Sequence, residues 1–198
     1  EVSNLAEGRA VLADAIKVAE EHGAKGLGCT AFVCDSLTQF QDWHEQDVAQ
    51  NTNQRFMGDN KKEGGWQQFN AEFGAFIDDL GVLSRYVTVI ALAHAKEKAD
   101  GSKGDWGGLN LRPQVALKAG RTANWVLYQT IRNISVEEGR KGDDFLHVYQ
   151  DASGSWRGTE VVINTQPVGF WIASANAKNL EAEEPANLAE MLKREGLF

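Results

Sequence analysis

The sequence of 198 residues is poor in cysteine and has no long apolar run. Its two cysteines, Cys29 and Cys34, are too few for the disulfide framework of a small secreted protein. The longest apolar stretches fall far short of the roughly 20 residues that a membrane-spanning helix needs. We therefore expect a cytoplasmic protein that has no membrane partner.

Positive charge is also in the minority. Lys and Arg total 20 against 28 Asp and Glu, which gives a formal net charge of -8. A protein with this balance has no overall positive field, so binding to DNA or RNA would need a local basic patch. Apolar residues make up 42% of the chain, as in ordinary folded domains. The length suits one domain, and we expect a single domain over residues 1–198.

Two amphipathic helices are predicted in the first half of the chain. Asn4 and Glu7 resemble a capping box, and apolar residues then recur at helical spacing up to Gly23. Between residues 66 and 80, aromatic and aliphatic side chains step by three and four, and we expect this stripe to belong to the core. Residues 41–65 are polar and predict a long surface segment, either partly helical or mobile.

Two short apolar runs predict buried strands at residues 30–35 and 86–93. A helix of about four turns lies between them, which is the pattern of a βαβ unit with parallel strands. The second half begins with a glycine-rich loop at residues 98–112 and then becomes richer in strands. There we expect a helix at 113–122 and antiparallel strands at 125–131, 145–150, 159–164 and 170–175. A last short helix is expected to begin at Pro185 and to end before Gly196.

Asp35 and Ser36 directly follow the first predicted strand. Open α/β sheets bind ligands at the carboxyl ends of their parallel strands. In nucleotide-hydrolysing folds an acid at this place holds Mg²⁺, usually through water, and the next hydroxyl can help. The alternative is structural, with Asp35 capping the following turn or helix.

His94 closes the second predicted strand, so it should reach the same edge as Asp35. There it could contact a terminal phosphate, although a structural histidine at a strand end is the alternative. Lys96 is expected to be an ordinary solvated lysine. The four histidines show no metal-ligand spacing with either cysteine, and no nucleophile elbow of the G-x-S-x-G type occurs. Residues 119–122 resemble a phosphate loop only faintly, because Val115 and Arg121 replace the glycine and the lysine that the pattern requires.

The order of these elements resembles the RecA-like P-loop ATPases of phages and prophages. The resemblance spans roughly residues 5–196 and rests on the order and spacing of motifs that are individually weak. The matching stretches are FVCDSLT at 32–38, WQQF at 66–69, VIALAHAK at 89–96, LRP at 111–113 and PANLAEMLKREG at 185–196.

This resemblance implies a RecA-like P-loop NTPase core, with a parallel sheet flanked by helices and an antiparallel, β-rich C-terminal part. By the resemblance, Asp35 is the Walker B acid with Ser36 beside it, and His94 is a sensor. Lys178 is similar to a late lysine that reaches the nucleotide of a neighbouring subunit in a ring or filament. The implied cofactors are ATP and Mg²⁺. The implied role is in DNA recombination or replication in a host cytoplasm.

The chain departs from the family at three places, the first of which is Asn124, where relatives often carry an acid. The phosphate loop would precede residue 1, and no G-x-x-x-x-G-K-[ST] occurs in the sequence. Leu180 stands where a second basic residue would follow Lys178. We therefore weigh two functions: the C-terminal portion of an ATPase that acts on DNA, or a degenerate, non-catalytic protein kept for oligomeric assembly or partner binding.

Two further hypotheses concern other chemistry. A metal-dependent nuclease would need acids clustered around Asp35, which the sequence does not show. If single-stranded DNA is a partner, we expect it to bind the glycine-rich loop. The Lys and Arg side chains of the loop would contact the phosphates, and an aromatic ring would stack on a base. The loop residues in question are Lys98, Lys103, Trp106 and Arg112.

Overall fold

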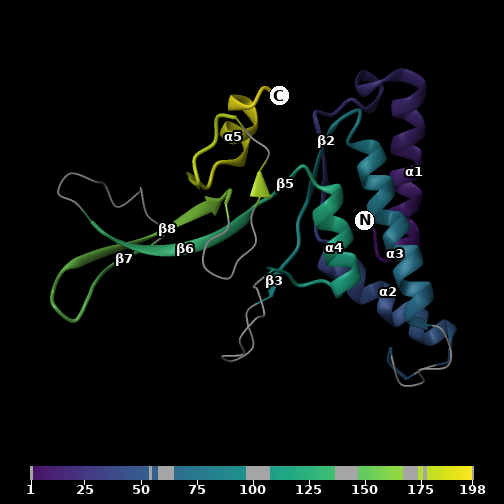
Figure 1. Ribbon diagram of the computed structural model, residues 1–198, viewed down its shortest axis with the longest axis horizontal. Helices are drawn as coiled ribbons and strands as arrows, with labels where there is room; N and C mark the ends of the chain where they lie inside the picture. The colour runs from purple at the N-terminus through teal and green to yellow at the C-terminus, as the bar shows by residue number, and fades with distance from the viewer. Residues whose placement is uncertain are drawn as a thin grey trace. The chain divides into compact units, whose positions relative to one another are not determined.

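The computed structural model describes residues 2–53, 55–57, 65–96, 108–136, 147–166, 174–175 and 178–197 (Figure 1). Backbone contacts divide the chain into two compact units. The first comprises residues 1–103 and 107–123, and the second comprises 104–106 and 124–198. The prediction of one domain over residues 1–198 stays a prediction. Among the described residues, no helix has the length and apolar character needed to cross a bilayer.

The first unit mixes helices with short strands. Figure 1 shows α1, α3 and α4 running side by side. Asn4 caps the first helix by accepting the Glu7 N–H, and Gly23 ends it with a φ of 67°, as the sequence predicted. The elements are α1 (Leu5–His22), the 3₁₀ turn η1 (Ala24–Leu27), β1 (Ala31–Cys34), α2 (Leu37–Asn51), α3 (Gly65–Leu83), β2 (Thr88–Ala91), β3 (Ala95–Lys96), β4 (Gly108–Leu109) and α4 (Pro113–Thr122).

The strands β1 and β2 pair in parallel, which confirms the predicted βαβ arrangement. Two helices, α2 and α3, connect them instead of the single expected helix. Side chains on β1 alternate between the two faces of the sheet. Phe32 packs against the core and Cys34 is buried in it, whereas Val33 between them is 56% exposed.

The helix α2 corrects the prediction of a surface segment over residues 41–65. Residues 37–51 form a regular helix, and one side of it is buried although many of its residues are polar. Gln41 is 6% exposed and His44 is 5% exposed, and the His44 ring stacks on Phe69 with 5.3 Å between centroids. The polar composition hid the burial of this helix, because the partners of Thr38 and Gln41 lie on distant segments, described below.

The aromatic stripe of α3 forms the centre of the core, as predicted. Phe69 and Phe73 are fully buried, and Phe76 is 2% exposed. The α1 helix approaches α2 closely at Gly8, where a β-carbon would lie 2.7 Å from Cε1 of Phe40. A hydrogen atom at this position is therefore what lets the two helices pack.

The second unit is built on an antiparallel sheet in the order β10-β8-β6, with β7 also paired to β8. The turn at residues 151–154 joins β7 and β8, as predicted, and Gly154 adopts a φ of 81° there. A separate antiparallel pair joins β5 and β9. The elements are β5 (Trp125–Val126), β6 (Tyr128–Ser135), β7 (His147–Gln150), β8 (Trp156–Asn164), β9 (Ser174–Ala175), β10 (Glu183–Pro185) and α5 (Leu188–Arg194).

Two predictions for this unit were wrong in detail. The single strand expected at 125–131 is divided into β5 and β6. Pro185 does not begin the last helix but ends β10, and α5 begins three residues later, because Asn187 caps it by accepting the Glu190 N–H. Residues 98–107 of the predicted loop and 170–173 of the predicted fourth strand lie outside the described part of the chain.

Candidate functional site at the carboxyl edge of β1 and β2

The parallel pairing of β1 and β2 brings their carboxyl ends to one edge. Cys34 lies opposite Ala91 in the register, so Asp35 and the residues after Ala91 leave the sheet on the same side. Two backbone bonds continue the pairing past the strands. The Leu92 N–H donates to the Cys34 carbonyl at 2.9 Å, and the Leu37 N–H donates to the Leu92 carbonyl at 2.8 Å. This edge is where the sequence predicted that an acid and an imidazole would meet.

Asp35 lies exposed at this edge, and its carboxylate has no hydrogen bond among the described residues. Ser36, linked to it by a cis peptide bond, is the residue that caps α2, because its Oγ accepts the Gln39 N–H at 3.2 Å. The structural alternative, in which Asp35 caps the helix, is therefore wrong. Burial, together with the neighbouring Asp35 carboxylate, raises the pKa of the Cys34 thiol to about 12, so this residue is a core residue and not a thiolate ligand.

His94 is held at the edge through both polar groups of its backbone. Its N–H donates to Oγ1 of Thr38 at 3.0 Å, and its carbonyl accepts the Asn110 N–H at 2.7 Å. The imidazole itself is solvent-exposed. Thr38 belongs to the first turn of α2, two positions after Ser36, so the helix that follows the acid also holds the histidine.

The edge suits a magnesium ion bound together with a phosphate better than one bound by protein alone. Among the residues that the structure describes, no group of three or more His, Cys, Asp or Glu side chains could hold a metal. Mg²⁺ is usually bound by one or two carboxylates plus waters and substrate phosphates, and the free carboxylate of Asp35 fits that type of site. Ser36 is 7% exposed and its hydroxyl already accepts the Gln39 N–H, so its expected help to the ion is limited by its role as a helix cap.

Arg112 joins the segment before α4 to α2 and α3. Its backbone N–H donates to Oε1 of Gln41 at 2.6 Å, and its guanidinium donates two bonds of 2.7 and 2.6 Å to Glu45. It also lies over the Trp66 ring, 4.5 Å from the centroid. The hydrogen bond to Glu45 raises the pKa of Arg112 further. In this structure Arg112 is thus engaged within the protein, and its expected contact with DNA stays a prediction.

The remaining predicted residues lie elsewhere. Lys178 is exposed in the second unit, where its N–H and that of Asn179 donate to the carboxylate of Glu195. Its proposed role at a neighbouring subunit is untested. Lys98, Lys103 and Trp106 lie outside the described residues. Residues 119–122, which resembled a phosphate loop, belong to α4.

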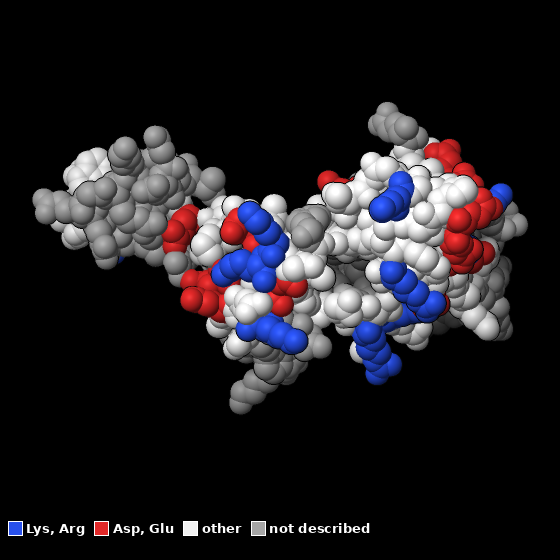
Figure 2. Space-filling view, turned by 90° about the horizontal axis from the view of Figure 1, so that it is seen from above, with Lys and Arg blue, Asp and Glu red and all other residues white. Residues whose placement is uncertain are grey.

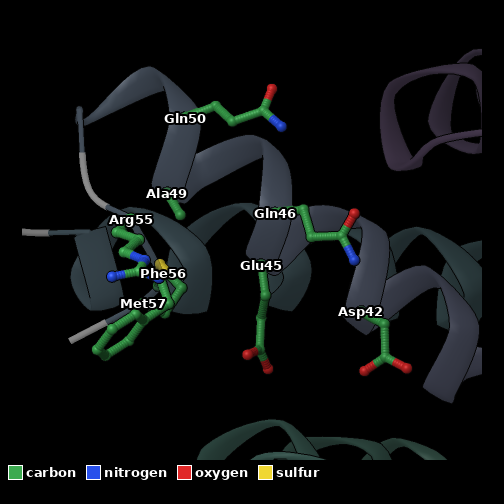
Figure 3. Close-up of a pocket in the computed structure, with 8 residues that line it drawn as sticks. All are labelled: Asp42, Glu45, Gln46, Ala49, Gln50, Arg55, Phe56 and Met57. Atoms are coloured by element: carbon green, nitrogen blue, oxygen red, sulfur yellow. The ribbon is translucent and has the colours of Figure 1, made fainter. Parts of the chain in front are cut away.

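A pocket of about 340 Å³ lies on the outer side of α2 and was not predicted from the sequence (Figure 3). Its lining combines two carboxylates and two amides from α2 with a guanidinium and two large apolar side chains from a short segment after the helix. Neither Asp35 nor His94 contributes to it. Its lining residues are Asp42, Glu45, Gln46, Ala49, Gln50, Arg55, Phe56 and Met57.

Charged side chains are mixed over the surface. On the face shown in Figure 2, uncharged and acidic side chains interrupt the Lys and Arg side chains of each unit. Among the described residues, this face therefore presents no continuous basic area to a nucleic acid, in agreement with the net charge of -8.

Comparison with known proteins gives one match. A family model described as an AAA domain matches residues 3–141, which is more than half of the chain. The matched range includes Asp35, Thr38 and His94 and ends before Lys178. No curated protein and no solved structure matches the chain.

Proposed function

The chain belongs to the AAA domain family, and from this premise we propose that it is a RecA-like protein of phage origin that uses ATP in DNA recombination or replication. Proteins of this family are nucleotide-binding, ATPase-type proteins that usually bind ATP with Mg²⁺. We assign the nucleotide to the carboxyl edge of β1 and β2. The single observation that supports this assignment is that a parallel pair delivers Asp35 and His94 to the same edge.

The two side chains would have different roles. Asp35, exposed and without a hydrogen bond among the described residues, would hold Mg²⁺ through water, and the ion would neutralise charge on the phosphates. His94 would contact the terminal phosphate through its exposed imidazole while its backbone remains fixed. Tight binding also requires backbone N–H groups and a lysine of a phosphate loop, for which the 198 residues contain no matching pattern.

Lys178 extends the proposal to an assembly. In a homo-oligomeric ring or filament, this lysine would approach the nucleotide of the neighbouring copy. Lys178 is an exposed residue, and Glu195 holds the backbone on which it lies by accepting the N–H groups of Lys178 and Asn179. Single-stranded DNA is proposed as the polymer on which the assembly acts.

The test is calorimetric titration of the full-length natural protein with Mg-ATP. We expect binding by the wild type and at least about tenfold weaker binding by Asp35→Asn and His94→Gln, since each removes one contact with a charged ligand. Asp14→Asn is the matched control, because it removes an equally exposed carboxylate on α1 and should bind like the wild type. If the full-length protein binds no Mg-ATP, or if Asp35→Asn binds as tightly as the wild type, the proposal is wrong.

A non-catalytic role in assembly or partner binding is the second candidate. Leu180 in place of a basic residue favours it. This role predicts an oligomer whose sedimentation coefficient is the same with and without Mg-ATP, and is the same for Asp35→Ala. A change of sedimentation on adding Mg-ATP would exclude it.

A further inference from the structure

One face of α2 carries three polar side chains that are largely shielded from water. Thr38, Gln41 and Glu45 follow each other at spacings of three and four, so they lie in one row along the helix. Thr38 is 4% exposed, Gln41 is 6% exposed and the Glu45 side chain is 17% exposed. Buried polar groups destabilise a fold unless they are hydrogen-bonded, so their partners explain why the row exists.

The first member of the row bonds to His94. A threonine in a helix commonly directs its hydroxyl to the carbonyl of the preceding turn, but the Thr38 hydroxyl instead reaches a residue 56 positions away. It accepts the His94 N–H at 3.0 Å and makes a longer contact of 3.5 Å with the Asn110 carbonyl. Because Asn110 in turn donates to the His94 carbonyl, the two peptide groups and the hydroxyl form one small network.

The other two members hold the far end of that network. Gln41 accepts the Arg112 N–H at 2.6 Å, and Glu45 accepts two bonds from its guanidinium. Arg112 is only two residues from Asn110. The row thus fixes the chain at His94 and again at Arg112, while the same helix begins at Ser36, directly beside Asp35.

We propose that Thr38 is the positioning residue for His94 and that Gln41 and Glu45 support it by anchoring Arg112. The row places the His94 backbone relative to the acid that precedes α2, because one helix begins beside Asp35 and also bonds to the His94 N–H. This inference rests on the proposed function for its consequence in nucleotide binding. The positioning itself depends only on the observed bonds.

The test compares three variants of the full-length protein. Thr38→Val keeps the shape of the side chain and removes the hydroxyl, and Thr38→Ser keeps the hydroxyl. Thr52→Val makes the same change at the end of α2, where the hydroxyl donates to the Val48 carbonyl. The two measurements are hydrogen exchange of the His94 amide and the shift of the His94 imidazole NMR signal when Mg-ATP is added.

In the wild type and in Thr38→Ser we expect a protected His94 amide. In Thr38→Val it should exchange about tenfold faster or more, because its acceptor is gone. Thr52→Val should leave it unchanged. A His94 amide that exchanges freely in the wild type, or equally slowly in Thr38→Val, would overturn the positioning role whether or not Thr38→Val folds well.

The nucleotide measurement separates the two proposals. If Mg-ATP shifts the His94 signal in the wild type and in Thr38→Ser but less in Thr38→Val, both proposals are supported. If the exchange result holds but all variants show the same shift and affinity, Thr38 does not act through His94 on the nucleotide. If the wild type does not bind Mg-ATP, the proposed function fails, and the exchange data still decide whether Thr38 holds His94.

Discussion

The ion pair between Glu45 and Arg112 should stabilise the first unit more than an ordinary surface pair does. The Glu45 side chain is 17% exposed and that of Arg112 is 45% exposed, so water screens the pair only in part. Exposed pairs contribute about 0–1 kcal/mol, and breaking a fully buried pair costs about 3–5 kcal/mol. The bidentate geometry and the Trp66 ring beneath the guanidinium favour Arg112 further. We expect a coupling energy of about 1–2 kcal/mol, between these limits.

A double-mutant cycle measures this coupling. The variants are Glu45→Gln, Arg112→Met and the double mutant. Their unfolding in urea is followed by circular dichroism, because replacing Arg112 would change the fluorescence of the Trp66 ring that it covers. The matched control is the Lys118–Asp78 pair, which has an equally short contact of 2.6 Å but side chains 37% and 59% exposed. Its cycle should give no more than about 1 kcal/mol, and that value should fall at high salt.

The test compares the coupling energies that the two cycles give. The two pairs have similar N–O distances, so we expect the difference to come from the exclusion of water from Glu45, the bidentate geometry and the Trp66 contact. If the coupling of Glu45 to Arg112 is no larger than that of Asp78 to Lys118 at the same ionic strength, exposure does not control the strength of these pairs and the argument is refuted.

Three other predictions concern the core. Burial lowers the pKa of His44, so the folded state binds a proton less readily than the unfolded state. The free energy of unfolding in urea should therefore fall as pH drops below about 6.5, the ordinary pKa of histidine. A His44→Phe variant that kept the same pH dependence would contradict this. Phe73→Ala should lower the free energy of unfolding by about 3–5 kcal/mol in urea titrations, because Phe73 is fully buried; a loss below about 1 kcal/mol would show that the stripe is not the core. Iodoacetamide should alkylate the exposed Cys29 in the native protein and leave the buried Cys34 unmodified, as judged by peptide mass spectrometry, whereas equal labelling would contradict the burial of Cys34.

The sequence predicted the elements whose apolar residues follow a clear period. The stripe of α3 steps by three and four and is buried, and β1 and β2 are short apolar runs that pair in parallel. The shared edge at the carboxyl ends of β1 and β2 could be predicted for the same reason, because parallel strands end on the same side of a sheet.

The sequence did not predict the elements that depend on distant partners. The buried side of α2 is polar, and the residues that satisfy Thr38 and Gln41 lie 56 and 71 positions away. No local pattern carries that information. The available signal was the spacing of Thr38, Gln41 and Glu45, which places them on one helix face shortly after the candidate acid Asp35. This spacing is hard to notice because most of the segment is polar. Pro185 misled for a related reason: proline suits both the first turn of a helix and the end of an edge strand, and only the pairing with β8 distinguishes the two.

The contact between Gly8 and Phe40 has a consequence for protein engineering. Replacing a mid-helix glycine by alanine is a standard way to make a protein more heat-resistant, with a usual gain of about 0.5–1 kcal/mol from the backbone. At Gly8 the added methyl group would press against an aromatic ring carbon of Phe40 at 2.7 Å, so this core ring would have to shift. A substitution chosen by consulting propensity tables alone would here loosen the protein, and Gly8 should be kept in any stabilised version of this chain.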